Sequence, residues 1–373
     1  MSSSNAHQIT MARKPKTKRN SQVESADTSL IPLSDPDAWR AALQTRRPVL
    51  AHLNADTTWL IQLPIPDGQS DASRSHFNIL LDPWLQGPQS DVASWFSTQW
   101  HVVAPSVGTM AELNTTLASL EGFGHEEAAQ HRFVDAVAIS HEFTDHCHRA
   151  TLEELSRETP VFATDEAAKL VRSWKHFDTV VTMPGLSSAS GSWQEALAGP
   201  ANVLPPWLGI GRVITAGNAL YYHSAVVVAF DLGYSAGPAA RTRSRRKSEP
   251  SGRGAEAVVY SPHGIHAPDL ECVAGSGLST VALLHGLHDV RIWMTAQLNL
   301  GALNGIKAAR TSGAKYWVAT HDEQKRGGGL VSWFLQRTVY TLRDAVEAEE
   351  AKSDDSEGYK FIELGSGDGM LLI

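Results

Sequence analysis

The chain has 373 residues, of which 42% are hydrophobic, and a formal net charge of −8. This content is enough to bury a large core, and the acidic balance argues against a protein that binds nucleic acid with its whole surface. No apolar run approaches the roughly 20 residues of a membrane span, the first residues contain no apolar signal-peptide core, and Cys147 and Cys272 are too few for a disulfide scaffold, so we expect a cytoplasmic protein.

The first 28 residues are rich in Ser, Lys and Arg and contain almost no large apolar side chain. A segment of this composition cannot bury enough apolar surface to fold, so we predict a disordered tail over residues 1–28. We interpret its basic run, Arg13–Arg19, as part of that solvated tail. A nuclear-import signal or a phosphate-binding patch is the alternative.

Two strands are predicted near the start of the ordered part, over residues 59–63 and 78–82. The turn-forming residues 64–75 between them predict a hairpin. Trp84, Trp95 and Trp100 follow, and large aromatic side chains more often line a core or a pocket than carry out chemistry.

The most informative stretch combines an apolar run with a polar loop. Residues 134–139 predict a buried strand, and the loop after it carries His141, Asp145, His146 and His148. Thr151-Leu-Glu-Glu154 then has the pattern of a capping box, which starts a helix. Imidazoles and a carboxylate at the end of a buried strand are metal-ligand types in the place where α/β folds have their sites. We therefore predict a metal site, with a chance cluster of surface histidines as the alternative.

Strands and helices alternate along the rest of the chain, which predicts helices packed on the faces of a sheet. The expected strands cover residues 160–163, 177–183, 213–215, 219–230, 257–260, 281–284, 315–320 and 361–364, and the expected helices cover 151–157, 165–174, 297–310 and 331–342. Residues 233–255, with the basic run Arg241–Lys247, are predicted to form a disordered insert, a role in binding phosphate or nucleic acid being the alternative. We interpret residues 345–358 as an acidic solvated linker and 327–329 as a flexible glycine loop.

Five more histidines lie in or directly after predicted strands: His223, His263, His285, His288 and His321. His223 interrupts an apolar run, where a lone histidine is more often hydrogen-bonded in the core than bound to a metal. The run from 365 to 369 superficially suggests a phosphate loop, but no helix is predicted after it, so a nucleotide site is disfavoured.

The stretch Ser140-His-x-x-x-Asp-His146 resembles the metallo-β-lactamase superfamily signature, His-x-His-x-Asp-His, which also follows a strand. The branch it resembles contains the ascorbate-phosphate lactonases and N-acylphosphatidylethanolamine phospholipase D, in a form found in fungi. The resemblance covers roughly residues 55–340. It implies an α/β protein with one domain over residues 29–373, built as a four-layer αβ/βα sandwich of two mixed β-sheets face to face with helices outside. It also implies that Asp82 supports the metal ligands without binding metal.

The family's ligand positions are only partly kept. Carried over, the first metal site retains His141 and His223 but has Phe143 in place of a histidine, while the second retains Asp145, His146 and His321. His263 stands where the family has a bridging aspartate, and an imidazole cannot bridge two ions. We therefore expect one zinc, with iron or manganese as alternatives, held mainly by Asp145, His146, His263 and His321. Cys147 or His148 could replace the missing ligand.

These residues predict a hydrolase that uses a metal-activated water on a small-molecule ester, lactone, thioester or phosphodiester. Asp145 is also a candidate general base, and His285 and His288 are candidates for substrate contact or proton transfer, the alternative being that they orient their loop. A second hypothesis is a degenerate member of the fold that binds a partner without turnover. A third, a nuclease, is disfavoured by the acidic charge and the lack of a basic face in the folded part.

Overall fold

The computed structural model describes residues 30–69, 74–90, 98–200, 202–214, 223–234, 254–292, 296–323, 325–328, 335–350 and 358–373. The predicted basic tail, most of the predicted insert, Trp95 and the first part of the strand expected at 219–230 lie outside these residues. None of the helices within them is long and apolar enough to span a bilayer.

The first large sheet is mixed, and its middle strands are buried on both faces. β3 and β4 form the predicted antiparallel hairpin, with Trp59 opposite Leu81, whereas β4, β6, β7 and β8 run parallel. Across the sheet the described strands are β1 (Ile31–Pro32), β19 (Asp368–Leu371), β2 (Val49–His52), β3 (Trp59–Pro64), β4 (His76–Leu81), β6 (Ala136–Ile139), β7 (Val161–Ala163) and β8 (Val180–Thr182).

The second large sheet is also mixed. β10 pairs antiparallel with β9 and with β11, which is the return strand predicted after the insert, and β11, β12, β15 and β18 run parallel. Across this sheet the described strands are β18 (Lys360–Ile362), β15 (Tyr316–Val318), β12 (Ser279–His285), β11 (Glu256–Ser261), β10 (Ser224–Phe230) and β9 (Leu208–Ile214).

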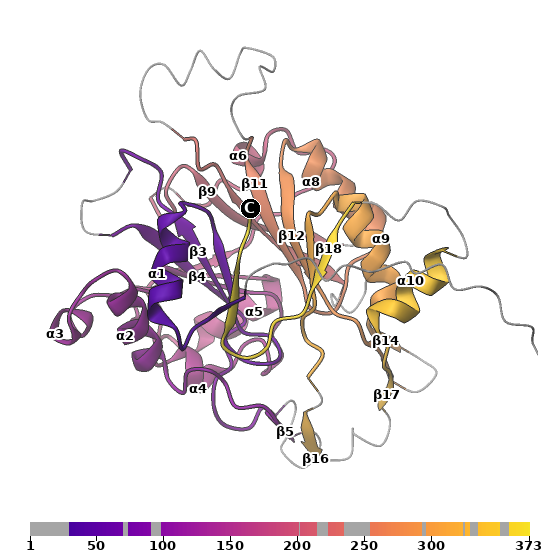
Figure 1. Cartoon of the computed structure of the whole chain (residues 1–373), viewed down its shortest axis with the longest axis horizontal. Coiled ribbons are helices and arrows are strands. Elements are labelled where there is room, and N and C mark those ends of the chain that lie inside the picture. Colours follow the sequence, from indigo (N-terminus) through magenta and orange to yellow (C-terminus); the bar gives the residue numbers. More distant parts are fainter. Residues whose placement is uncertain are drawn as a thin grey trace, which may run out of the picture.

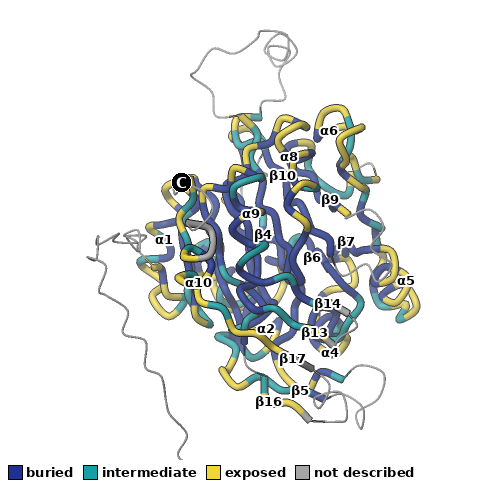
Figure 2. The backbone as a smooth tube through the Cα atoms, turned by 90° about the vertical axis from the view of Figure 1, so that its right-hand side faces the viewer, coloured by how far each residue is buried: buried dark blue, intermediate teal, exposed yellow. Residues whose placement is uncertain are grey.

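The two sheets face each other across a shared apolar core. Side chains from both sheets, including Trp59, Ile79 and Phe162 of the first and Val228 and Tyr260 of the second, form one buried cluster. Figure 2 shows the strands of this region buried along most of their length and the exposed residues gathered at the helices and loops. Burial of this continuous apolar layer is what holds the sheets together.

Helices cover the outer faces of the sheets, as Figure 1 shows for α1 and α2 on one side and α9 on the other. The apolar sides of two sets of helices pack in two further clusters. Against the first sheet lie α1 (Pro36–Gln44), α2 (Met110–Leu120), α3 (His125–Ala128), α4 (Arg149–Leu152) and α5 (Asp165–Ser173), and against the second lie α6 (Trp193–Ala196), the 3-10 turn η1 (Ala267–Leu270), α8 (Glu271–Gly275), α9 (Ala302–Ser312) and α10 (Leu342–Glu350). The result is the predicted four-layer αβ/βα sandwich.

Two small sheets lie outside this sandwich. One consists of β14 (Ala296–Asn299), β13 (Asp289–Ile292) and β17 (Leu335–Thr338), and the other of β16 (Arg326–Gly328) and β5 (Thr98–Trp100). The prediction of a flexible glycine loop is wrong for Gly327 and Gly328. Both lie in β16 and pair with Gln99 and Thr98 of β5.

Three predicted helices are wrong in extent or type. Residues 297–299 belong to β14, because they pair with β13, and the helix begins only after Gly301, whose N–H donates to Asp289 Oδ1 at 2.6 Å. Residues 335–338, expected as helix, are β17 and also pair with β13. The helix expected at 151–157 is the four-residue α4, which begins earlier, with His148 as its N-cap. In each case a long-range pairing or a local cap overrides helix propensity.

The acidic segment is also partly ordered. Residues 342–350 form α10, and its buried Ala345 joins the apolar cluster that contains α9. An apolar side that repeats at helical spacing can therefore fold a segment whose exposed side is acidic. Residues 351–357 lie outside the described part of the chain.

An ion pair connects the two sheets at one end of the shared core. Both terminal nitrogens of Arg47, which precedes β2, lie 2.8 Å from the carboxylate oxygens of Glu256 at the start of β11. Arg47 Nε also donates to the carbonyl of Leu372 at 2.9 Å. The side chains of Arg47 and Glu256 are only 10% and 16% exposed, so water screens this bidentate ion pair little.

Substitution of Arg47 by Met should lower the free energy of unfolding by about 2–3 kcal/mol, because the aliphatic stem stays while the carboxylate of Glu256 loses its partner in a poorly solvated place. Urea denaturation followed by tryptophan fluorescence measures this. The matched control is Arg343→Met on α10, whose exposed pair with Glu347 spans one helical turn and whose loss should leave the urea midpoint unchanged. Equal urea midpoints for Arg47→Met and the wild type would show that the ion pair does not stabilise the packing of the two sheets.

Candidate metal centre

Polar side chains gather at one edge of the sandwich, where parallel strands of both sheets end. In the first sheet, β4 is followed by Asp82 and β6 by the loop that carries His146. In the second, β11 is followed by His263 and β15 by His321. The carboxyl ends of parallel strands meet at one edge, so residues far apart in the sequence come together there.

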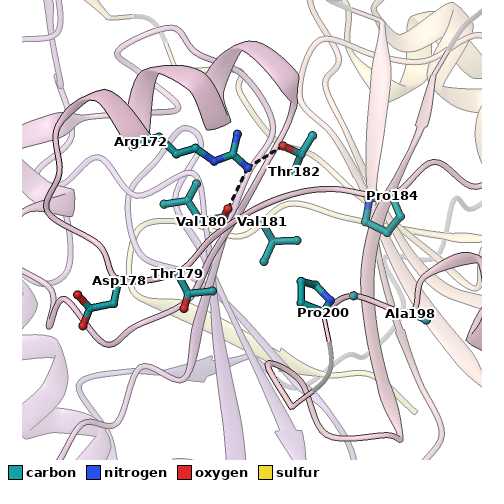
Figure 3. A pocket seen from close by; sticks show the side chains of 10 residues that line it. Arg172, Asp178, Thr179, Val180, Val181, Thr182, Pro184, Ala198 and Pro200 are labelled. Atoms are coloured by element: carbon teal, nitrogen blue, oxygen red, sulfur yellow. Dashed lines mark hydrogen bonds between the residues drawn. The ribbon is translucent and has the colours of Figure 1, made fainter.

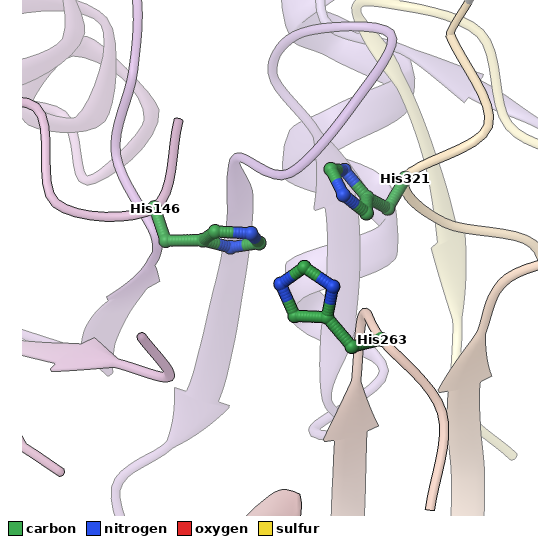
Figure 4. A group of neighbouring side chains, drawn as sticks. All are labelled: His146, His263 and His321. Atoms are coloured by element: carbon green, nitrogen blue, oxygen red, sulfur yellow. The ribbon is translucent and has the colours of Figure 1, made fainter. Parts of the chain in front are cut away.

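His146, His263 and His321 form a buried triad, which we call the histidine triad. Their ligand nitrogens all lie within 4.8 Å of one another, and the ring centroids are 4.8 to 5.1 Å apart. Figure 4 shows the three rings turned toward a common point. This arrangement could hold a metal ion.

Each ring of the histidine triad uses Nδ1 to contact an oxygen. Nδ1 lies 2.7 Å from Asp82 Oδ2 in His146, 2.8 Å from Asn299 Oδ1 in His263 and 3.0 Å from Asp56 Oδ1 in His321. An Nδ1–H that donates to these acceptors leaves Nε2 as the nitrogen that would bind an ion. Nε2 of His146 is buried and forms no hydrogen bond within the described residues. Metal-binding histidines are typically oriented in this way.

The carboxylate of Asp82 holds the ring of His146, which is the supporting role that the resemblance implies for it. Besides His146, its carboxylate accepts hydrogen bonds from the backbone N–H of Ser140 at 2.7 Å, from the Ser140 hydroxyl and from the Tyr260 hydroxyl at 2.8 Å. Its φ of 43° and the φ of 58° at His321 are uncommon for residues other than glycine. Such conformations persist where the surroundings fix the backbone, and here they aim the two side chains into the site.

Asp56 supports His321 from the turn between β2 and β3. The backbone carbonyl of Asp56 accepts from the N–H of His321 at 2.9 Å, and its carboxylate contacts the imidazole of the same residue. Asp56 is fully buried. The turn thus positions the last histidine with two contacts at once.

Lys325 reaches into the centre from the segment after His321. Its ammonium lies 2.7 Å from Asp56 Oδ2 and 2.8 Å from Asp145 Oδ2, and the side chain is 9% exposed. It also stands 5.3 Å from the centroid of the Trp84 ring, within the range of a cation–π contact. A lysine in contact with two buried carboxylates is held in its charged form.

The pKa values follow from burial and these contacts. Burial, together with the neighbouring imidazoles, lowers the pKa of His263 well below its usual value. Burial would raise the pKa of Asp145, but Lys325 and the neighbouring imidazoles lower it well below its ordinary range. Burial also opposes charge on Lys325, yet Asp145 and Asp56 raise its pKa. The pKa of His146 shifts the other way: burial lowers it, but the carboxylates of Asp145 and Asp82 raise it overall. Metal binding requires neutral imidazoles, so an ion bound at the triad would displace a proton from His146 wherever that ring is charged.

Asp145 was expected to be a ligand of the metal. Its Oδ1 lies 3.6 Å from Nε2 of His146, and its other oxygen contacts Lys325. Asp56, Asp145 and His321 form a second group whose ligand atoms lie within 4.8 Å of one another. Asp145 therefore lies at the centre, and the ammonium of Lys325 is closer to its carboxylate than the imidazole of His146 is.

His141 and His223, expected in a first metal site, are not brought together with the triad's nitrogens. The ring of His141 stacks on Phe143 at 4.2 Å and lies 5.4 Å from that of His263. His223 Nδ1 contacts the carbonyl of Gly264 at 3.3 Å, and its ring faces that of His266. His141 Nδ1 also lies 3.1 Å from Glu142 Oε2.

His285 and His288 were candidates for substrate contact or proton transfer. Both ring nitrogens of His285 are engaged, Nδ1 with the carbonyl of Gly286 at 2.8 Å and Nε2 with Asn304 Nδ2 at 3.0 Å. These contacts favour a structural role. His288 Nδ1 is 3.5 Å from Asp322 Oδ1, and burial, reinforced by the charge of Arg337, lowers its pKa to about 4.

Cys147 and His148 were considered as replacements for the missing ligand. Burial raises the pKa of the Cys147 thiol, so the thiolate that binds metal is disfavoured. His148 Nδ1 instead contacts the Thr151 hydroxyl at 2.8 Å as it caps α4. His148 therefore serves the local fold of the loop, whereas Cys147 is a buried free thiol.

A pocket of about 210 Å³ opens beside His141. Arg212, Lys169 and three carboxylates give it a strongly charged lining, together with Thr164. A larger surface pocket, of about 620 Å³, lies elsewhere, between α5 and β8, where Arg172 donates to the Val180 carbonyl and the Thr182 hydroxyl (Figure 3). No residue of the histidine triad is among the residues that line either pocket. The smaller pocket adjoins the centre through His141, whose ring lies 5.4 Å from that of His263.

Sequence reasoning missed three residues of the centre: Asp56, Asn299 and Lys325. Asn299 fell inside a predicted helix, and Lys325 follows the last expected ligand by four positions. The signal for Asp56 was available in principle, since residues 54–58, apart from Ala55, are polar and stand between two apolar stretches. The structure shows these four polar residues fully buried, which requires hydrogen-bond partners for them.

Replacement of Asp82 by Asn should weaken zinc binding about 10- to 100-fold, because an amide holds the His146 ring less firmly and makes it a poorer ligand. Equilibrium dialysis against chelator-buffered zinc measures the affinity. Asp37→Asn on α1, where the carboxylate is exposed and pairs only with Arg40 in the described structure, is the matched control and should bind zinc like the wild type. Unchanged affinity in Asp82→Asn would remove Asp82 from the support of the centre.

A scan against protein-family models finds no match, and a search of curated proteins finds none either. Among solved structures the chain is similar to an isothiocyanate hydrolase from Delia radicum gut bacteria, with 14% identity over 86% of this chain and 98% of that chain and a TM-score of 0.48. It is also similar to a possible metal-dependent hydrolase from Veillonella parvula (11% identity, 87% and 99% covered, TM-score 0.47) and to the metallo-β-lactamase fold protein YhfI from Bacillus subtilis (13% identity, 87% and 98% covered, TM-score 0.41). A likeness at this level assigns no substrate to this chain.

Proposed function

We propose that this chain is a metal-dependent hydrolase with one divalent ion held by the histidine triad. The observation that carries the proposal is the orientation of the three rings: His146, His263 and His321 each engage an oxygen through Nδ1 and turn the other nitrogen toward a common point. Three nitrogen ligands with a position left for water are the ligand set of a catalytic zinc.

The donor set fits zinc, and iron or manganese are the alternatives that elemental analysis would identify. When bound, such an ion supplies an activated water and polarises a carbonyl or phosphoryl oxygen. The chain's own contribution is to fix the ligands before substrate arrives. Asp82, Asn299 and Asp56 each hold one ring of the triad.

Asp145 is the carboxylate placed to orient the attacking water. Its Oδ1 lies 3.6 Å from Nε2 of His146, beside the position that the ion would occupy, while Lys325 anchors its Oδ2. A carboxylate anchored through one oxygen presents the other in a fixed direction. We assign Asp145 this positioning role, in place of the role of metal ligand expected from the resemblance.

The pocket beside His141 supports a small polar substrate. Its lining combines the cations of Arg212 and Lys169 with Glu142, Asp165 and Glu166. Asp165 pairs with Arg212 and Glu166 with Lys169, so the pocket offers paired charges and no basic channel for a polyanion. An ester, lactone, thioester or phosphodiester of small size is the substrate class we propose, and a nuclease remains disfavoured.

The resemblance of the Ser140–His146 motif adds the branch to this proposal, namely the group of ascorbate-phosphate lactonases and N-acylphosphatidylethanolamine phospholipase D in its fungal form. A cytoplasmic location is proposed as well. Its support is that Cys147 and Cys272 are buried free thiols, as expected in a reducing compartment.

Purified wild-type protein, reconstituted with zinc and dialysed, should contain about one ion per chain by elemental analysis, and His263→Ala should lose most of it, because two imidazoles hold zinc far less tightly than three. The matched control is His125→Ala, on the exposed start of α3, which should retain the ion. Hydrolysis of a panel of ester, lactone, thioester and phosphodiester substrates should require the ion and disappear with a chelator.

A wild-type protein without metal after reconstitution would contradict the proposal and leave the alternative of a binding protein without turnover. Metal bound equally by the wild type and His263→Ala would contradict the histidine triad as the ligand set while leaving the presence of a metal intact.

A further inference from the structure

The candidate centre contains two overlapping places for a cation. The histidine triad is one, and the group of Asp56, Asp145 and His321 is the other, with His321 common to both. At the second place the ammonium of Lys325 is 2.7 Å from Asp56 Oδ2 and 2.8 Å from Asp145 Oδ2. A divalent ion bound to these same oxygens would have to displace a charged group in direct contact with both.

Several contacts fix Lys325 in this position. Its neighbour Arg326 begins β16, which pairs with β5, and on its other side Glu323 Oε1 accepts from the backbone N–H groups of Val102 and Val103 at 2.7 and 2.9 Å. Residues 98–103, which comprise β5 and the three residues after it, thus contact the chain before and after the lysine. The Trp84 ring centroid lies 5.3 Å from the ammonium.

The charges of the centre also match one ion and one ammonium. Three buried carboxylates, those of Asp56, Asp82 and Asp145, contact either a ring of the triad or Lys325. One divalent ion and one lysine neutralise these three negative charges, whereas two divalent ions with the lysine would leave an excess of positive charge in a place with little water. Uncompensated buried charge is strongly unfavourable.

We propose that the ammonium of Lys325 takes the place of a second metal ion, so that the centre combines one divalent ion with one fixed organic cation. The inference rests on the proposed function for the first ion only. Unlike a second metal, this cation cannot be removed by a chelator, and it stands where it can stabilise negative charge that develops on a substrate oxygen.

The test is the number of zinc ions bound at saturation by the full-length chain, measured by titration with zinc chloride and by elemental analysis after dialysis. The wild type should bind one. Lys325→Met, which keeps the length of the side chain and removes its charge, should bind two, because Asp56 and Asp145 are then left without their cation. If Lys325→Met does not fold, Lys325→Gln replaces it with the same expected count.

Three further variants separate a specific effect from a general one. Lys325→Arg keeps the charge and should bind one ion, as should Lys307→Met, in which an exposed lysine of α9 is replaced. Lys325→Met combined with Asp145→Asn should return the count from two to one, because the second site has then lost a carboxylate.

The possible failures are distinguishable. Two ions in the wild type, or the same count in Lys325→Met as in the wild type, would overturn the role of Lys325. No ion in the wild type would overturn the proposed function, and in that case one ion gained by Lys325→Met would still support the lysine as the occupant of a metal position. The absence of zinc from both proteins would overturn both.

Discussion

The structure depends on the compensation of negative charge buried where two sheets meet. Asp56 and Asp82 are fully buried and Asp145 is nearly so, and a carboxylate in such a place is stable only if donors or cations surround it. Asp82 has a serine, a tyrosine and an imidazole, and the other two share Lys325. The same contacts that stabilise these charges hold the imidazoles in the orientation that a metal requires.

Because the ligands come from both halves of the sandwich, the centre exists only when the sheets are docked. His146 follows a strand of the first sheet, whereas His263 and His321 follow strands of the second. The apolar layer between the sheets therefore sets the distance between ligands, and an ion bound there would in turn join the two halves. Folding and metal binding are coupled in such an arrangement.

Local patterns predicted many of the core strands and the helices at 165–174 and after 301, because apolar periodicity and capping residues act over a few positions. They did not predict β2, β19 or most of β9. They failed where a distant partner decides the structure. Residues 297–299 have helix-forming neighbours but pair with β13, and residues 335–338 do the same from the other side of that strand. The residues of the candidate centre divide in the same way between local and long-range origin. The loop from His141 to His148 was visible in the sequence as a cluster of histidines, whereas Asp56 and Lys325 become neighbours of that loop only through the fold.

The sequence alone determined the strand that ends before His146 and placed the histidines of the triad at or after the ends of strands, since each depends on residues adjacent in the chain. Only the tertiary structure decided which of these histidines meet. It kept His141 and His223 outside the triad and engaged both nitrogens of His285 with the backbone and Asn304. It also brought Lys325 between two carboxylates that precede it by 269 and 180 positions. Burial makes such a contact strong, but no local pattern encodes it, because the partners lie on different elements and the docking of the sheets sets the distance between them.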